Sequence, residues 1–508
     1  MKKLFKYFFS TAALLVILSS CDEGFDEMNT NLVDPTTLDP AYLLNRAIIS
    51  SSGAGDNIIY ELGIVQYIIT PNGGVLGGAN FNQDNRSAAG RNWRQFYRVI
   101  LKHTTDVKRM TAEDESRSNL YHMARIWHSY GAMILTDTYG DVPYQEAGLG
   151  FLEFNVEPTY NTQQSIYEDV LRELEQASAA LDASKTVETS EILYGGNVEK
   201  WRRLGYSLML RAAIRHTKVA PNVAQEYVAK AVAGGVMQSN DDNAVIYHNP
   251  NFTNGVGGTL NGGERNNFYL TQPFVNHLMI TDDPRLASIA VRYVGAQNGG
   301  QQTPDIADRD PEVQIGMPLG HDNASIAPVA QNLGLASFYD FSQLDRNRMG
   351  SQNAPAFLVT YSQTLLLLAE AAVRNWVQAD PAELYEGGIR AHMNQLAEYG
   401  PDVAIDPAEI EAYVQANPLD MGNALEEINT QYWLASFLDP YEAFANFRRS
   451  GYPDLPPNPF PGKEITTDFI RRLTFPDTEY AVNLGNIQEA NNRQGPDRLD
   501  TRVWWDQP

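Results

Sequence analysis

Apolar residues recur at intervals of three and four positions over much of this chain, a spacing that predicts amphipathic α-helices. Asn161 or Thr162 is suited to cap the helix that follows. The apolar stripe behind that cap comprises Ile166, Val170, Leu174, Ala177 and Leu181. Further stripes begin at Trp201, Leu358, Ile389 and Leu425. No clean 34-residue repeat accompanies them, so the pattern alone predicts an all-α dominated chain without specifying a repeat family.

One of these stripes differs from the others in being apolar nearly all round. It runs from Leu358 through Leu365, Leu368 and Ala372 to Trp376. A helix that is hydrophobic on every face is usually buried on every face. We therefore expect one helix across this stretch, enclosed by its neighbours.

Two long regions interrupt the helical pattern, at about residues 70–92 and 247–350. Both are rich in glycine pairs and asparagine, and the second also contains many glutamine and proline residues. Loop-rich stretches of this length inside a compact domain are usually functional or disordered. We therefore look for a ligand site in these two regions rather than on the helical stripes.

The N-terminal segment resembles a signal peptide for secretion. Residues 1–20 combine three lysines, a short apolar run and small residues, and are predicted to be a lipoprotein signal peptide. Leu18-Ser19-Ser20-Cys21 resembles a bacterial lipobox, which makes Cys21 the predicted site of acylation. Acidic residues follow, so residues 21–40 are predicted to be an acidic tether of the kind that resembles a surface-export signal. The alternative is a plain cleaved signal with an incidental cysteine.

The composition excludes several kinds of ligand and site. The 508 residues include 38 Lys and Arg against 62 Asp and Glu, a net charge of -24, which disfavours nucleic acid as the ligand. Cys21 is the only cysteine, so disulfide frameworks, CxxC redox sites, thiolate zinc sites and iron–sulfur clusters are excluded within one chain.

Familiar catalytic signatures are absent. There is no HExxH, GxSxG, P-loop or dinucleotide fingerprint, so we predict no catalytic residue, no cofactor and no metal site. His122 and His128 are six residues apart, which places them on different faces of a helix. Asp308, Asp310 and Glu312 alternate in a loop, which leaves calcium binding open. Paired carboxylates of a glycoside hydrolase also remain open, although abundant acids are not evidence for them.

One local motif is more specific. Asp137 to Tyr144 reads DTYGDVPY and follows an apolar helix, where Gly140 and Pro143 are suited to stop that helix. This segment resembles the DxYGDVPY signature of the SusD/RagB family of outer-membrane nutrient-binding lipoproteins. Other segments resemble further family motifs in the same order: 161–167, 200–215, 283–286, 316–320 and 428–433, where Tyr432 replaces the usual lysine.

The resemblance implies a tetratricopeptide-like helix-pair scaffold with a loop-rich irregular half, forming a single SusD-like domain over residues 41–508. It implies that the protein captures oligosaccharides and delivers them, as a lid, to a SusC-type TonB-dependent transporter in the outer membrane. Capture of oligopeptides by the same architecture is the alternative, and a surface glycan hydrolase is a third reading. The DxYGDVPY residues belong to the scaffold in this family, and no catalytic residue is carried over.

Aromatic rings that stack on sugars and side chains that donate hydrogen bonds mark the candidate ligand contacts. They are Phe81, Asn82 and Trp93 near the first loop region, and Phe252, Arg265, Asn267, Phe338 and Tyr339 in the second. Two of these have a competing structural role. Trp93 begins a helical pattern and could belong to the core, and the aromatic patch at 338–341 could pin its loop to the scaffold.

Overall fold

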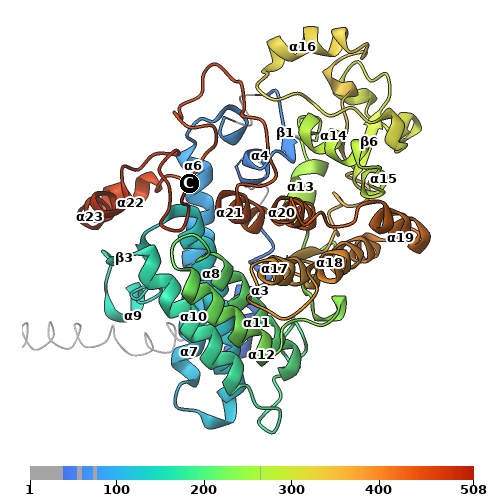
Figure 1. Cartoon of the computed structure of the whole chain (residues 1–508). Helices are drawn as coiled ribbons and strands as arrows, with labels where there is room; N and C mark the ends of the chain where they lie inside the picture. Colours follow the sequence, from blue (N-terminus) through green and yellow to red (C-terminus); the bar gives the residue numbers. More distant parts are fainter. Residues whose placement is uncertain (1–37, 54–59, 73–76, 264) are drawn as a thin grey trace, which may run out of the picture.

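The structure is a computed structural model that describes residues 38–53, 60–72, 77–263 and 265–508 (Figure 1). Helices dominate it, as the periodicity predicts, and the strands are short. Within these residues, no helix combines the length and apolar character needed to cross a membrane. Cys21 and the predicted signal peptide lie outside the described residues.

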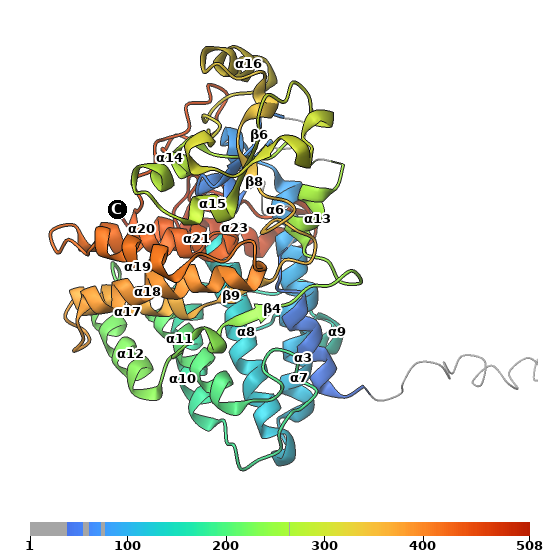
Figure 2. The ribbon, with the colours of Figure 1, turned by 90° about the vertical axis from the view of Figure 1, so that its right-hand side faces the viewer.

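One set of long helices packs side by side at one end of the molecule (Figures 1 and 2). In this set α8 packs against α7 and α10, and α11 packs against α10 and α12, so consecutive helices form stacked hairpins. The members are α3 (Pro40–Ile49), α7 (Lys102–Thr111), α8 (Ser118–Tyr139), α10 (Gln163–Ala180), α11 (Val198–Ile214) and α12 (Pro221–Gly234).

A second set of helices crosses the middle of the molecule in Figure 2. There α17 contacts α11, α18 and α20, which joins the two sets into one scaffold. The members are α17 (Tyr361–Val373), α18 (Pro381–Gln395), η10 (Leu396–Tyr399), α19 (Pro407–Ala416), α20 (Ala424–Ala435) and α21 (Pro440–Ser450).

The loop-rich part lies at the other end, around α16 and β6 in both views. Its short elements come from residues before α7 and between α12 and α17. They are α4 (Glu61–Ile64), β1 (Ile68–Ile69), η2 (Ala79–Phe81), α6 (Arg86–Gln95), α13 (Gly255–Asn261), β5 (Tyr269–Leu270), α14 (Gln272–Ile280), α15 (Arg285–Ile289), β6 (Ala290–Tyr293), η6 (Gly299–Gln301), η7 (Pro304–Ile306), β7 (Ala307–Asp308), η8 (Pro311–Val313), α16 (Asn323–Asn332), η9 (Phe338–Asp340) and β8 (Gln343–Leu344). The π-helical η3 (Phe96–Leu101) follows α6 and packs against α3, α7 and α8 of the first set.

The remaining elements are short connections within the scaffold and in the C-terminal segment. They are η4 (Glu115–Arg117), β2 (Val142–Pro143), α9 (Gly150–Glu153), β3 (Tyr160–Asn161), η5 (Asn240–Asp242), β4 (Ala244–Ile246), β9 (Ala356–Val359), α22 (Asp477–Val482) and α23 (Leu484–Gln494). The described strands form antiparallel pairs β1–β5, β2–β3 and β4–β9 and the three-stranded order β7–β6–β8. Ile68 faces Leu270 in the first pair, which ties the two loop regions together.

The structure confirms the helix that was predicted behind the Asn161–Thr162 cap, which is α10. Thr162 is the cap, because its Oγ1 accepts a hydrogen bond from the Ser165 amide at 3.2 Å. All five predicted apolar positions of this stripe are buried, from Ile166 to Leu181. A one-sided apolar pattern therefore located both the helix and the face that it buries.

The stripe predicted from Leu358 to Trp376 is only partly helical, and the expectation of one continuous helix is wrong at both ends. Leu358 lies in strand β9, and α17 starts after Thr360, whose side chain forms a capping box with Gln363. The helix ends at Val373, before Trp376. Short apolar runs do not separate strand from buried helix, so the pattern merged two elements.

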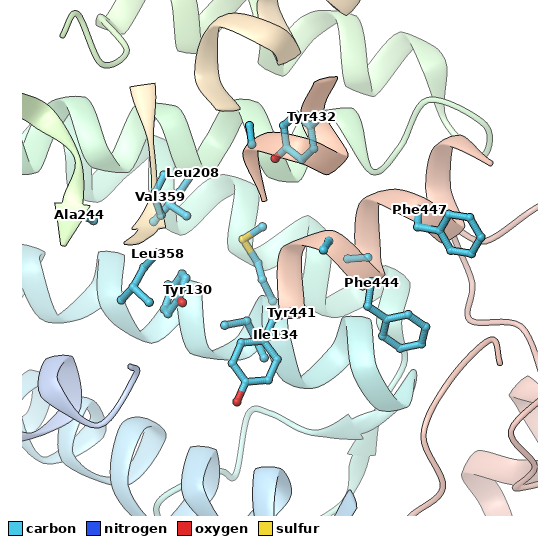
Figure 3. Close-up of a cluster of buried hydrophobic side chains, with 14 of the residues drawn as sticks. Tyr130, Ile134, Leu208, Ala244, Leu358, Val359, Tyr432, Tyr441, Phe444 and Phe447 are labelled. Atoms are coloured by element: carbon cyan, nitrogen blue, oxygen red, sulfur yellow. The ribbon is translucent and has the colours of Figure 1, made fainter. Parts of the chain in front are cut away.

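Segments that are far apart in sequence meet in the core where the two helix sets join (Figure 3). Tyr130 and Ile134 from α8 lie near Leu358 of β9 and Tyr441 of α21, as the close-up shows. All four are 8% exposed or less. Removing this much apolar and aromatic surface from water is the main stabilising contribution to the scaffold.

The DxYGDVPY segment is a buried junction. The Asp137 carboxylate accepts hydrogen bonds from the Tyr167 hydroxyl at 2.5 Å and from the Trp505 indole at 2.9 Å, and lies 3.3 Å from Arg215. Gly140 ends α8 with φ +82°, and a Cβ there would lie 2.1 Å from Gln494 Oε1. Only glycine fits this position, so the motif fixes how α8 meets the C-terminal segment.

Candidate functional site

A stacked pair of aromatic side chains lies on the loop-rich part. Phe338 and Tyr339 both come from η9, with ring centroids 4.2 Å apart and planes 28° apart, and both are half-buried. We call this pair the aromatic shelf. Stacked rings that remain partly open to solvent offer apolar faces of the kind that a sugar ring or another flat apolar ligand can cover.

Hydrogen bonds hold the shelf in place. Asp340, 2% exposed, accepts from the Gly295 amide at 3.0 Å and from Arg292 Nε at 2.9 Å. Ser337 caps η9 by accepting from the Tyr339 amide and donates to Ala296 O at 2.8 Å. These contacts attach η9 to β6 and the turn after it, so the two rings sit on a fixed support.

The 265–269 segment lies next to the shelf. Tyr269 meets Phe338 edge-on at 6.3 Å, and its hydroxyl donates to Asn266 O at 2.6 Å. Burial raises the pKa of Tyr269, so this hydroxyl stays protonated and remains a donor. Arg265 is exposed and Asn267 is half-buried.

Two further side chains connect this segment to η9. Arg346 donates to Arg265 O at 3.2 Å and to Gln302 O at 2.7 Å, and Gln302 donates to Tyr339 O at 2.9 Å. Four of the eight predicted contacts, Arg265, Asn267, Phe338 and Tyr339, therefore share one region of the surface. Gln302 and Arg346 support that region, and the sequence carried no signal for them.

Phe81 and Asn82 lie elsewhere, against residues 458–464. Phe81 is 4% exposed and stacks on Phe460 at 4.2 Å, with planes 28° apart. Asn82 has φ +51° and its carbonyl accepts from the Glu464 amide at 2.9 Å. In this arrangement the two residues join the first loop region to the C-terminal segment.

Trp93 is enclosed in the core. It is 4% exposed, and its ring contacts Tyr97 at 4.7 Å, Tyr139 at 5.1 Å and Phe475 at 5.8 Å. This position fits the core role that its helical pattern suggested. Phe252 is also separate from the shelf; it is half-buried and stacks on His248 at 4.9 Å.

A large acidic groove runs between α14 and α19. Its volume is about 830 Å³, and an adjoining hollow of about 490 Å³ shares Thr281 and Tyr413 with it. Its acidic lining consists of Asp282, Asp283, Asp310, Glu312 and Glu409. Exposed Met279 and Ile280 also line it. The sequence did not predict this groove, because its two walls are more than a hundred residues apart.

The calcium hypothesis for Asp308, Asp310 and Glu312 finds no support in the geometry. Asp308 Oδ1 accepts from the Asp310 amide, and Asp310 Oδ1 accepts from the Glu312 amide. Across residues 38–53, 60–72, 77–263 and 265–508, no group of three or more His, Cys, Asp or Glu side chains is placed to hold a metal ion. His128, the other metal-binding residue type considered, is hydrogen-bonded within the protein, with its Nδ1 2.9 Å from Thr104 Oγ1.

Comparison with protein families gives a direct assignment. A SusD-like family model, described as "Starch-binding associating with outer membrane", matches residues 32–476. The chain therefore belongs to the SusD-like family. No curated protein matches it.

Solved structures agree on the fold. A structure described as a chitin-binding protein is 31% identical with a TM-score of 0.82, covering 92% of this chain and 100% of that one. A structure described as "Bacteroidetes AC2a SusD-like" is 26% identical with a TM-score of 0.81, over 93% and 100% of the two chains. A chitin-binding SusD homologue from Flavobacterium johnsoniae is 25% identical with a TM-score of 0.70, over 92% and 95%.

Proposed function

We propose that this protein is a non-catalytic binding protein of the outer-membrane surface that captures oligosaccharides and delivers them to a SusC-type TonB-dependent transporter. The observation that carries the proposal is the aromatic shelf, a supported and partly exposed pair of rings on the loop-rich part of a SusD-like chain. Arg265 and Asn267 beside it supply donors for sugar hydroxyls.

The relatives suggest which sugar to try first. Two similar structures carry descriptions that name chitin, and the family description names starch. We therefore propose N-acetylglucosamine oligomers as the first ligand and glucose oligomers as the comparison. Both are neutral, which suits a chain of net charge -24 better than an anionic glycan does.

Calorimetric titration of the mature protein with N-acetylchitohexaose and maltohexaose tests the proposal. We expect binding of at least one, and Tyr339→Ala to weaken it about tenfold through the loss of one stacking ring. Phe154→Ala is the matched control, because Phe154 is 85% exposed and lies outside the shelf. Unchanged affinity in Phe338→Ala and Tyr339→Ala, with melting temperatures also unchanged, would place the site elsewhere.

The same two oligosaccharides also test whether the protein is a hydrolase. A binding protein leaves the oligosaccharide intact over many hours, whereas a surface hydrolase shortens it. Chromatography of the ligand after incubation separates the two, and any turnover that survives repurification would contradict the non-catalytic proposal.

The acidic groove favours a second candidate, capture of oligopeptides. Asp283 is buried in an ion pair with Arg285, but the other four carboxylates of the groove and the exposed Met279 and Ile280 suit a peptide that carries both basic and apolar side chains. A panel of short lysine- and arginine-containing peptides tests this. Binding that falls steeply with salt and is lost in Asp282→Asn with Glu409→Gln would favour peptides over sugars.

The membrane assignments extend the proposal to the N-terminal segment. Residues 1–20 act as the signal peptide, Cys21 carries the lipid, residues 21–40 form the acidic tether, and residues 41–508 form one domain. The transporter partner is tested by isolating the protein from detergent-solubilised outer membranes. Repeated isolation without a large barrel protein would count against the partnership.

A further inference from the structure

A second hollow, well away from the aromatic shelf, has the composition of a saccharide site. It has a volume of about 410 Å³, within the range of roughly 300–1,000 Å³ that is typical of small-ligand pockets. Its walls come from residues 193–200, 240–247 and 394–398, with Phe357 of β9. We call it the amide groove. The strands that line it, β4 and β9, lie beside the helical scaffold in Figure 2, whereas β6 and β8 lie toward the loop-rich end.

An exposed tyrosine stands at the edge of this groove. Tyr247 follows β4 directly and is 63% exposed, whereas Ile246 before it is 4% exposed. Its hydroxyl donates to Glu398 Oε2 at 3.2 Å, which restrains an otherwise solvent-facing ring. Phe357 lines the same groove and packs on Tyr399 at 5.6 Å. An exposed ring restrained at a groove edge is suited to stack on a flat ligand.

Amide side chains supply the polar lining. Asn243 Nδ2 lies 3.3 Å from Gln395 Oε1, and Asn243 Oδ1 accepts from the Tyr361 amide at 2.7 Å, which fixes both amides. Asn394, on the last turn of α18, is exposed, and its side chain makes no hydrogen bond with any of the described residues. Amides both donate and accept, which matches the two roles of a sugar hydroxyl.

Three charged residues line the groove, Lys200, Asp241 and Glu398, and two of them are engaged. Lys200 Nζ donates to Asp241 O at 2.6 Å and lies 5.8 Å from the centre of the Tyr194 ring. Glu398 is the acceptor for Tyr247. This balance differs from the acidic groove, whose lining carries five carboxylates. A groove with aromatic faces, amides and little net charge favours a neutral polyhydroxylated ligand over a charged one.

We propose that the amide groove is a second carbohydrate site, which binds a neutral sugar unit by stacking on Tyr247 and by hydrogen bonds to the exposed Asn394 beside the fixed amides. The proposal rests on the proposed glycan-binding function and adds a site that is independent of the aromatic shelf. A chain with two such sites holds a polysaccharide at two places.

The test uses the mature protein with the shelf disabled by Phe338→Ala and Tyr339→Ala together. Calorimetry with N-acetylchitohexaose and maltohexaose then reports the remaining site. We expect residual binding that weakens about tenfold more when Tyr247→Ala is added, and less when Tyr247→Phe is added, because phenylalanine keeps the ring. Asn394→Ala should weaken it severalfold. Phe154→Ala is the exposed-aromatic control, and melting curves confirm that every variant is folded.

The outcomes separate the two proposals. If Tyr247→Ala and Asn394→Ala change neither affinity nor stoichiometry, while the shelf variants lose all binding, the amide groove is overturned and the proposed function stands. If Tyr247→Ala removes binding and the shelf variants do not, the groove is supported and the shelf is overturned. If neither hexasaccharide binds, saturation-transfer NMR with millimolar N-acetylglucosamine and glucose decides. A signal that disappears in Tyr247→Ala supports the groove, whereas a signal that persists in that variant, or the absence of any signal, overturns it.

Discussion

Glu370 of α17 and Arg449 of α21 face each other inside the scaffold, joined by two parallel hydrogen bonds of 2.8 Å. Both side chains are 1% exposed. Asn429 of α20 donates to the same carboxylate at 3.1 Å, so α17, α20 and α21 of the second set converge on it. An ion pair buried this deeply is costly to desolvate, and it is retained only because both partners are fully hydrogen-bonded.

Removing the Glu370 carboxylate should strongly destabilise the fold. Glu370→Gln leaves the Arg449 guanidinium buried without a counter-charge, and we expect the free energy of unfolding to fall by about 3–5 kcal/mol. Arg374→Gln is the matched control, since Arg374 pairs with the same carboxylate at 2.9 Å but is 28% exposed, and should cost about 1 kcal/mol or less. Denaturant unfolding measures both. Equal losses in the two variants would contradict the role of burial.

The same pair predicts an acid-sensitive component of stability. Burial raises the pKa of Glu370, but the Arg449 guanidinium lowers that pKa by more than burial raises it. The net pKa is about 2, against 4.5 in an unfolded chain. Because the folded pKa is the lower one, this stabilisation is complete above pH 4.5 and is lost as the pH falls toward 2. It amounts to about 3 kcal/mol. The free energies of unfolding of the wild type and of Glu370→Gln should converge as the pH falls from 6 to 3. A constant difference between them would contradict this pH dependence.

Asp439 predicts the opposite dependence. Burial raises the pKa of its carboxyl to about 7, although Arg211 lowers it in part. The folded pKa is the higher one, so this group stabilises the fold at low pH and its contribution is lost as the pH rises from about 4 to 7, by roughly 4 kcal/mol. Asp439→Asn keeps an acceptor for Gln363 and should flatten the stability curve between pH 5 and 8. Asp477→Asn, on an 83% exposed side chain, should leave the curve unchanged.

Gly140 should tolerate no side chain. In Gly140→Ala the new methyl would lie 2.1 Å from Gln494 Oε1, on a backbone with φ +82°. We expect a loss of more than about 2 kcal/mol in unfolding free energy, from backbone strain and the clash together. Gly235→Ala isolates the strain, because Gly235 has φ +94° and nothing within 4 Å of its Cβ position. A loss no larger than that of Gly235→Ala would show that Gln494 moves freely aside.

Cys21 should be the point of membrane attachment. We expect Cys21→Ala to abolish palmitate labelling and to leave an unprocessed precursor, because the acylated residue is also the processing site of a lipobox. Labelling with a clickable palmitate and gel mobility measure the two effects. A variant that is processed normally and still partitions with membranes would disprove the assignment.

The sequence predicted those parts of the fold that local pattern determines. The stripe from Ile166 to Leu181 identified a helix and its buried face, and the DxYGDVPY segment identified a helix end. Leu358 was misassigned because four apolar residues in a row suit a buried strand as well as a helix. Family resemblance, rather than periodicity, supplied the arrangement of the helix pairs.

The candidate site was less predictable, because exposure is a property of the tertiary structure. Trp93 and Phe81 have the residue type of a sugar platform, but Phe475 and Phe460, nearly 400 residues away, cover them. The amide groove shows the reverse case. Tyr247 and Asn394 carry no motif and are 147 residues apart, and only the pairing of β4 with β9 beside α18 brings them to one hollow.

The bond between Trp505 and Asp137 has a consequence for how the cell handles this chain. Asp137 is synthesised early, yet its carboxylate stays without the indole donor until a segment made after every helix has arrived. A product that stops short of Trp505 therefore leaves the Asp137 carboxylate one hydrogen bond short at the centre of the scaffold, with Tyr167 and Arg215 still beside it, and its core opens more readily than that of the full chain. Chains that open more readily are better substrates for proteolysis, so the fold itself distinguishes a complete chain from a truncated one.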